Sequence, residues 1–391
     1  MSELNIQRSK IRGYVLYFLF LGVLTFIAGE IILHYLGKPK PKNLGWLSSS
    51  SYEVSDELNE LHLRGRKFHY DDQDFIVVLL GDSQVECAAC SFSFLPEQSL
   101  ERELKKHNER IKVFSLGTGG WGQDQQLYVL NNYLEKYRAD LVVLWQTPQN
   151  DIWNNVFPTH WARNGQPKPT YELVEGDLVS PNFSDMYTER FFYKSKVFSA
   201  FDTLFHIIDL DGRFDSKLPP AYKAQKVKED GHYCDLWQRR WELNFADMRA
   251  ENLSSEKSHL AIHLTPISPR LNYGVELTRR LVNEIRNTVK RKGGEFLTFR
   301  TLTLDQNPLS TSSDCSAQEA AYSLNGLSYT VDKSQVDAIY RRINNESDNF
   351  EVNLKSHPYP FVSSLDSHLN ESTTTGVMVQ LGEYIVRNYK F

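Results

Sequence analysis

One run of apolar residues constrains the fold of this chain more than any other feature. Phe75–Leu80 is rich in Val, Ile and Leu, and it stops abruptly at Gly81-Asp82-Ser83. An uninterrupted run of this length is typical of a strand that is buried on both faces, as in a parallel sheet. Open α/β sheets place their reactive groups at the carboxyl ends of such strands. Ser83 is therefore a candidate reactive residue, although an ordinary turn would also explain the tripeptide.

Further apolar runs extend this pattern along the chain. Two follow closely, at Ile111–Leu116 and Ala139–Trp145, with apolar residues at helical spacing between them. This alternation indicates βαβ units and a parallel sheet. The pattern resumes with strands expected at His259–Leu264 and Phe296–Phe299, and an amphipathic helix around Leu381 closes the chain. We expect an α/β fold, namely a three-layer α/β/α sandwich with a parallel five-stranded sheet of the flavodoxin-like type.

The N-terminal region contains a stretch long enough to cross a membrane. Tyr14–Leu33 carries a single charge, Glu30, and at ~1.5 Å per residue a helix over it covers the ~30 Å hydrocarbon core. A cleaved signal peptide is the main alternative, but no small-x-small cleavage site follows the apolar stretch. We therefore expect a retained transmembrane helix. Basic residues are equally numerous on its two sides, so the positive-inside rule leaves the orientation open.

These features predict an order of segments along the chain. The expected segments are an N-terminal tail, a transmembrane anchor, a linker rich in Lys and Pro, and one α/β domain, at 1–13, 14–36, 37–70 and 71–391. The alternation of strands and helices disappears at about 152–257 and 305–360, and we interpret both stretches as insertions. Aromatic residues in the first insertion could stack on sugar rings or form a local hydrophobic cluster.

Charge and cysteine content exclude several classes of protein. The net charge is −5, and no long run of Lys and Arg is present, which argues against a nucleic-acid partner. Cys87 and Cys90 have no second close pair, so a compact zinc site is not expected. We expect neither a metal nor a cofactor. These two cysteines are thiols of structural importance or a disulfide near the candidate site, and the pairing of Cys234 and Cys315 stays open.

A glycine-rich turn follows the second expected strand. Gly117–Gly122 contains G-x-G-x-x-G between a strand and a helix, as in dinucleotide-binding folds. Those folds also need an acidic residue about 20 positions on, at the end of the next strand, whereas Asp140 begins its strand. The alternative is an oxyanion hole, in which backbone N–H groups face the charge that develops in acyl transfer. Asn150, at the end of the third expected strand, would add a side-chain donor.

Asp366 and His368 stand just before the last expected helix. A general base and the carboxylate that orients it must meet the nucleophile in space rather than in sequence. An isolated Asp-x-His is most often a surface turn. The pair becomes informative only together with Gly81-Asp82-Ser83, the glycine-rich turn and Asn150.

Taken in order, the blocks Gly81-Asp82-Ser83, the glycine turn, Asn150-Asp151 and Asp366-Ser367-His368-Leu369-Asn370 resemble the SGNH (GDSL-type) hydrolase family. The resemblance implies that Ser83 is the nucleophile, His368 the general base and Asp366 its orienting acid. It also implies an oxyanion hole made by the backbone N–H of Ser83, by Gly120 and by Asn150. Gly120 is assigned because the family's glycine follows a strand-end asparagine by five residues, and Ser115 stands in that asparagine's place. Asp366 precedes the histidine by two residues instead of the usual three.

The resemblance implies a membrane-anchored serine esterase that cleaves acyl esters, with O-acetyl groups of a cell-surface or secreted polysaccharide as the expected substrate. An O-acyltransferase that uses the same residues is one alternative, and a non-catalytic glycan-binding envelope protein is another. We expect a single-pass membrane protein whose catalytic domain lies in the periplasm or outside the cell.

Overall fold

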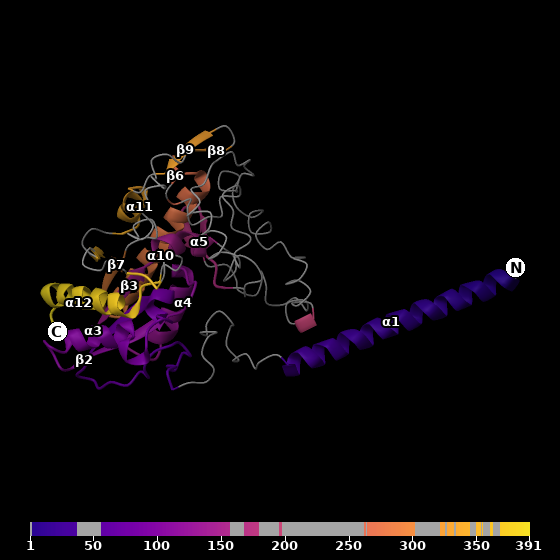
Figure 1. Cartoon of the computed structure of the whole chain (residues 1–391), viewed down its shortest axis with the longest axis horizontal. Coiled ribbons are helices and arrows are strands. Elements are labelled where there is room, and N and C mark those ends of the chain that lie inside the picture. Colours follow the sequence, from indigo (N-terminus) through magenta and orange to yellow (C-terminus); the bar gives the residue numbers. More distant parts are fainter. Residues whose placement is uncertain are drawn as a thin grey trace. The chain divides into compact units, whose positions relative to one another are not determined.

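The computed structural model describes the chain in segments, which are coloured in Figure 1. These are 2–36, 56–156, 168–179, 195–197, 262, 264–301, 321–324, 327–331, 334–344, 349–352, 354, 360–362 and 368–391. The chain divides into two compact units, one that contains the N-terminal helix and one that contains the α/β domain. Much of both expected insertions lies outside the described residues, as do Cys234, Cys315 and Asp366.

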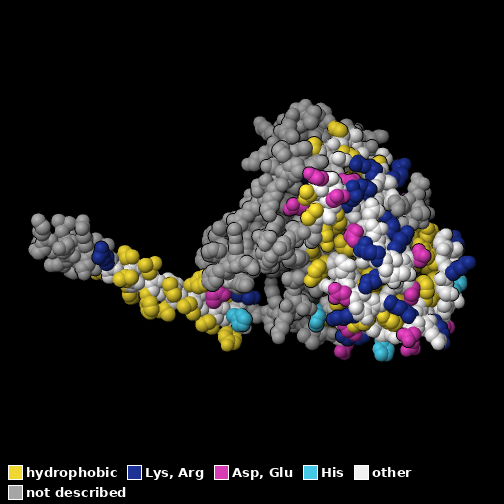
Figure 2. All heavy atoms as spheres, turned by 180° about the vertical axis from the view of Figure 1, so that it is seen from behind, with side chains coloured by type: hydrophobic (Ala, Val, Ile, Leu, Met, Phe, Trp, Pro, Cys, Tyr) yellow, Lys and Arg dark blue, Asp and Glu magenta, His cyan; other side chains and the backbone are white. Residues whose placement is uncertain are grey.

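The first unit is dominated by helix α1 (Ser2–Leu36). Within it, Arg12–Tyr35 forms a 24-residue stretch with a mean hydropathy of 2.3. Large apolar side chains from Tyr14 to Tyr35 are exposed along this helix, and Figure 2 shows them as a yellow surface. The expectation of an N-terminal helix that is long and apolar enough to span a membrane is therefore confirmed.

The second unit is built around a parallel five-stranded sheet, as expected. Its strands are β1 (Phe75–Gly81), β2 (Ile111–Gly117), β3 (Leu141–Gln146), β7 (Glu295–Arg300) and β10 (Asn349–Glu351). They lie in the order β10-β7-β3-β1-β2, with every neighbouring pair parallel. Numbered by their succession along the chain, the strands have the order 2-1-3-4-5. This order makes β2 and β10 the edge strands.

Two details of the sheet differ from the sequence-based expectation. Most of the strand expected at His259–Leu264 lies outside the described residues, and its last residue belongs to β6 (Leu264–Thr265). That strand pairs antiparallel with β9 (Leu327–Val331), which also pairs with β8 (Ala321–Leu324), in a separate small sheet. The fifth parallel strand is instead β10, which comes from the second expected insertion. A further hairpin is formed by β4 (Glu172–Val174) and β5 (Asp177–Val179).

Helices separate the strands and follow the last of them. They are α2 (Ser83–Glu86), α3 (Pro96–Leu104), α4 (Gln123–Leu134), α5 (Pro148–Val156), α10 (Pro269–Arg291), α11 (Gln335–Ile343) and α12 (Glu371–Asn388), with the short 3₁₀ helix η1 (Phe92–Phe94) before α3. Helix α10 follows the N-cap Ser268, whose side chain accepts the N–H of Leu271 at 3.0 Å. Helix α12 is capped in the same way by Asn370.

The central strands are buried on both faces. Val77 and Leu79 of β1 belong to a core cluster that also contains Leu100 of α3 and Leu381 of α12. The alternate residues, such as Val78, are equally inaccessible to solvent. Side chains of successive strand residues point to opposite faces, so both faces of the sheet are covered. This explains why the strand sequence is continuously apolar rather than alternating.

Among the described residues, the outer edge of β2 is held by side chains and not by a further strand. Glu97 and Glu101 of α3 accept the backbone N–H groups of Ser115 and Val113 at 2.7 and 2.9 Å. Arg66 binds both carboxylates. Its backbone N–H donates to Glu97 at 2.7 Å, and its guanidinium donates to Glu101 at 3.1 Å. An edge strand with free N–H groups would invite pairing with another chain. These bonds also fix the strand that leads into the glycine turn.

Burial raises the pKa of Glu97 to about 7 despite the nearby Arg66 charge. The folded protein thus holds this proton more tightly than the unfolded chain does, so stability from Glu97 falls as pH rises from about 4.5 to about 7. Over this pH range, we expect the free energy of unfolding of Glu97→Gln to fall by about 3 kcal/mol less than that of the unmodified chain. Urea denaturation of the detergent-solubilised chain, followed by tryptophan fluorescence between pH 5 and 7.5, measures the difference in slope.

Glu101→Gln is the matched control for this slope. Burial acts to raise the pKa of Glu101, but the bonds from Arg66 outweigh it and lower the pKa to about 2. The stability that Glu101 contributes is therefore lost only as pH falls below about 4.5. Its replacement should leave the slope between pH 5 and 7.5 unchanged. Parallel curves for Glu97→Gln and the unmodified chain would contradict the assignment of the slope to Glu97.

Candidate active site

The candidate residues gather at the carboxyl ends of the neighbouring strands β1 and β3. The strand order reverses here, because β2 lies on one side of β1 while the later strands lie on the side of β3. In open α/β sheets this switch point is where ligands bind. Ser83 is the first residue of α2, separated from the end of β1 by one residue, and Asn150 lies in the first turn of α5, which follows β3. The topology therefore brings two of the predicted residues to one place.

Ser83 and His368 meet although they are 285 residues apart in sequence. The Ser83 Oγ lies 2.8 Å from the His368 Nε2. Ser83 is half-buried at the start of α2, and His368 is exposed just before α12. The turn into α2 requires glycine at position 81, since a Cβ there would lie 2.5 Å from the Cγ2 of Val85. The pair has the hydrogen-bond geometry that a nucleophile and its general base need.

The segment that carries His368 is held on both sides. Its carbonyl accepts the N–H of Val362 at 2.8 Å. The N–H of the next residue, Leu369, donates to the side chain of Gln84 at 3.2 Å. Gln84 directly follows the candidate nucleophile, so it joins the serine segment to the histidine segment. Asp366, the expected orienting acid, lies outside the described residues.

Asp82 is a buried carboxylate that organises the serine turn and Asn150. Its oxygens accept the N–H of Gln84 at 3.0 Å, the hydroxyl of Thr147 at 3.0 Å and the amide of Asn150 at 2.9 Å. Burial raises the pKa of Asp82, while these bonds and a positive charge on His368 oppose the shift. The carboxylate therefore fixes the Asn150 side chain through their hydrogen bond.

A second buried carboxylate, Asp151, lies behind Asn150. Burial raises its pKa well above the usual value, and the charge of Asp82 adds to the shift. The hydroxyl of Tyr340 donates to Asp151 at 2.8 Å, and the N–H of Thr147 donates to it at 3.1 Å. The two carboxylates differ in role, because Asp82 contacts the candidate site residues whereas Asp151 ties α5 to α11.

The three expected oxyanion donors have N–H groups to offer. Among the residues that the structure describes, neither the N–H of Ser83 nor that of Gly120 donates a hydrogen bond. Gly120 has a φ of +72°, which glycine adopts without strain. The Asn150 amide carries two N–H groups, and its bond to Asp82 uses one of them.

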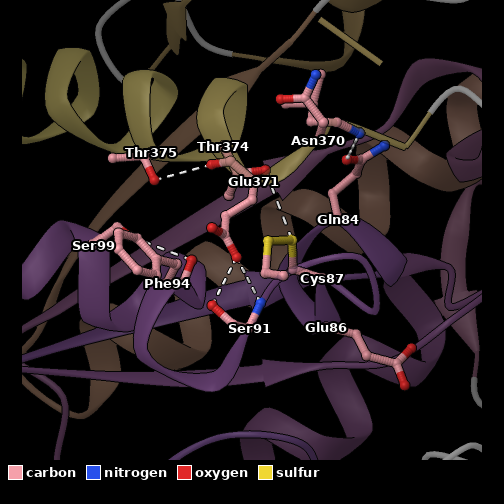
Figure 3. Close-up of a disulfide and its surroundings, with 12 residues drawn as sticks. Gln84, Glu86, Cys87, Ser91, Phe94, Ser99, Asn370, Glu371, Thr374 and Thr375 are labelled. Carbon is pink, nitrogen blue, oxygen red and sulfur yellow. Dashed lines mark hydrogen bonds between the residues drawn. A yellow bond between two sulfur atoms is a disulfide. The ribbon is translucent and has the colours of Figure 1, made fainter. Parts of the chain in front are cut away.

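A disulfide closes the loop that follows α2. Cys87 and Cys90 are paired, which resolves one question that the sequence left open. The sulfur of Cys87 lies 3.7 Å from the hydroxyl of Thr374 in α12. Glu371, also in α12, accepts the N–H and the hydroxyl of Ser91 at 2.8 and 2.7 Å (Figure 3). The loop after the candidate nucleophile is thereby fastened to the helix after the candidate base.

Sequence reasoning missed the residues that support this arrangement. Gln84, Glu86 and Thr147 are buried polar residues next to the predicted blocks. Arg64 is buried as well, although its segment was expected to be a linker. The available signal was the polar series Asp82, Gln84 and Glu86 directly after a buried strand.

The chain was compared with protein-family models and with curated proteins. No protein-family model matches the chain, and no curated protein matches it.

Proposed function

We propose that the chain is a membrane-anchored serine esterase of the SGNH type that cleaves acyl esters through a covalent acyl-enzyme. The observation that carries the proposal is the 2.8 Å contact between the Ser83 Oγ and the His368 Nε2. These two side chains come from opposite ends of the α/β domain and meet at the switch point of the sheet. A serine hydroxyl bonded to an imidazole at such a place is the arrangement that acyl transfer requires.

In the proposed mechanism, each of these groups has a defined role. His368 removes the proton of Ser83 as its oxygen attacks the acyl carbonyl carbon, and the carbonyl oxygen becomes negatively charged. The N–H groups of Ser83 and Gly120 and the Asn150 amide stabilise this oxyanion. The protonated His368 then gives its proton to the leaving alcohol. Water, deprotonated by His368, attacks the acyl-enzyme and releases the acid, which regenerates Ser83. Asp366 orients the imidazole in this proposal.

The proposed setting follows from the rest of the chain. The helix at Arg12–Tyr35 anchors the protein as a single-pass membrane protein, and the α/β domain lies in the periplasm or outside the cell. The Cys87–Cys90 disulfide supports this side of the membrane, because disulfides persist in oxidising compartments. The strand order 2-1-3-4-5 supports a three-layer fold of the flavodoxin-like type. The proposed substrates are O-acetyl esters on a cell-surface or secreted polysaccharide.

Reaction with a fluorophosphonate probe tests the proposal. An activated serine should bond to the phosphorus, and mass spectrometry should locate the adduct on Ser83. A protein that only binds glycan should give no adduct there, which would overturn the esterase assignment. Product analysis with an acetylated oligosaccharide, with and without an acceptor sugar, then separates hydrolysis from transfer. Free acetate in both cases is the expected result.

Asn150→Ala should lower kcat by roughly a hundredfold to a thousandfold, because the oxyanion loses a donor in the transition state. KM should change little, since the ground-state carbonyl carries less charge. Hydrolysis of p-nitrophenyl acetate measures both constants.

Thr147→Val is the control for this loss. It removes the other side-chain hydrogen bond to Asp82 and leaves the amide of Asn150 in place. If both variants lost the same activity, the effect would belong to the support of Asp82 and not to an oxyanion donor.

A further inference from the structure

The carboxylate of Glu86 joins the helix of the candidate nucleophile to the glycine turn. Glu86 is the last residue of α2 and is only 6% exposed. Its Oε2 accepts the N–H of Gly119 at 2.6 Å. Hydrogen bonds to a charged acceptor are roughly twice as strong as neutral ones. The bond therefore fixes the turn one residue before Gly120, which bears a proposed oxyanion donor.

The backbone of Glu86 is itself held from both directions. Its N–H donates to the carbonyl of Asp82 at 3.1 Å. Its carbonyl accepts from the guanidinium of the buried Arg64 at 3.4 Å, and the same guanidinium donates to the carbonyls of Cys87 and Cys90. The backbone of Glu86 is thus hydrogen-bonded at both its N–H and its carbonyl. A carboxylate carried by such a segment holds its partner at a defined position.

The spacing along α2 connects this contact to the nucleophile. Ser83 and Glu86 are three residues apart, so their side chains lie near each other along one side of the helix. Figure 3 shows that Gln84 points toward the segment of Asn370, whereas Glu86 points away from it. The two side chains thus reach different blocks from one short helix. Gln84 contacts the segment of the base, and Glu86 contacts the glycine turn.

We propose that Glu86 is a positioning residue of the oxyanion hole, because its bond to the Gly119 N–H aims the N–H of Gly120 at the acyl oxygen. This inference rests on the proposed esterase function. Glu86 does not touch the reacting atoms and does not exchange a proton with them. Its effect is on the transition state, where a donor displaced by about 1 Å costs on the order of a hundredfold in rate.

Four variants of the full-length chain in detergent test the inference. Glu86→Ala removes the acceptor, and Glu86→Met removes it while it fills the same volume. Glu86→Gln keeps an oxygen that can accept the Gly119 N–H. Glu60→Ala is the matched control, because Glu60 also accepts a backbone N–H, that of Phe68 at 2.8 Å, but in a different segment. Hydrolysis of p-nitrophenyl acetate and the rate of fluorophosphonate labelling are measured for each, together with thermal unfolding.

Glu86→Ala and Glu86→Met should lower kcat and the labelling rate by about tenfold to a hundredfold. KM and the pH of half-maximal activity should stay unchanged, because His368 is not displaced. The kcat and labelling rate of Glu86→Gln should remain within about threefold of those of the unmodified chain. Glu60→Ala should have the same kcat and labelling rate as the unmodified chain.

Three results would overturn the inference: full activity of Glu86→Met, equal loss in Glu86→Gln and Glu86→Met, or failure of both acceptor-free variants to fold. Absence of labelling in the unmodified chain would instead refute the esterase function itself.

Discussion

Ser83→Ala is expected to abolish ester cleavage and fluorophosphonate labelling together. Without the hydroxyl there is no nucleophile at the end of β1, and His368 loses the group from which it takes a proton. In serine hydrolases with this kind of pair, removal of the nucleophile lowers kcat by roughly 10⁴-fold to 10⁶-fold. The fold should persist, since Ser83 is half-buried and its side chain bonds only His368 among the described residues. Stopped assays with p-nitrophenyl acetate and labelling of purified protein measure the loss.

Ser93→Ala is the control for Ser83→Ala. Ser93 lies ten residues further along the chain and is exposed, so its replacement should leave turnover and labelling at the level of the unmodified protein. Residual activity above about 1% in Ser83→Ala would mean that another group attacks the ester, and the assignment of the nucleophile would be wrong.

His368→Ala is expected to cause a loss of similar size, roughly 10⁴-fold to 10⁶-fold in kcat. The Ser83 hydroxyl would then lack the base that lies 2.8 Å from it. Because His368 is exposed, a small base from solvent can reach the vacated position. Addition of imidazole to the variant should therefore restore part of the activity in proportion to its concentration.

His107→Ala is the control for the histidine. His107 is exposed and follows α3, away from the carboxyl ends of the strands. It should retain full activity and show no response to imidazole. If His368→Ala kept more than a tenth of the activity, or if imidazole raised turnover equally in both variants, His368 would not be the general base.

The sequence predicts those strands whose burial requires an uninterrupted run of apolar residues. The run at β1 is continuously apolar because the strand is covered on both faces, and the same holds for Leu141–Trp145 of β3, whereas β2 includes Lys112 and Ser115. Strand β10 has no such run. It has only three residues, Asn349-Phe350-Glu351, and in the part of the chain that the structure describes it lies at the edge of the sheet and pairs with β7. An edge strand of this length cannot be distinguished from a loop by its pattern.

The candidate site divides in a similar way. Ser83 and His368 were predicted from their order in the chain, and the structure brings them together. Arg64, Gln84 and Glu86 were not predicted, because a polar side chain is normally exposed and its burial follows from tertiary packing. The contact between Glu86 and Gly119 joins segments 33 residues apart. No local pattern in the sequence encodes such a pairing.

The separation of Ser83 and His368 along the chain has a consequence for biosynthesis. A ribosome makes α1 and β1 before the histidine segment and α12. The nascent chain therefore carries the serine without the imidazole that lies beside it in the folded protein until 285 further residues have been made. Helix α12 packs on α3 in the same core cluster as β1, so the part of the core that α12 supplies and the serine–histidine pair both form only after that segment has been made. The reactivity proposed for Ser83 therefore requires the histidine segment and α12 as well as β1.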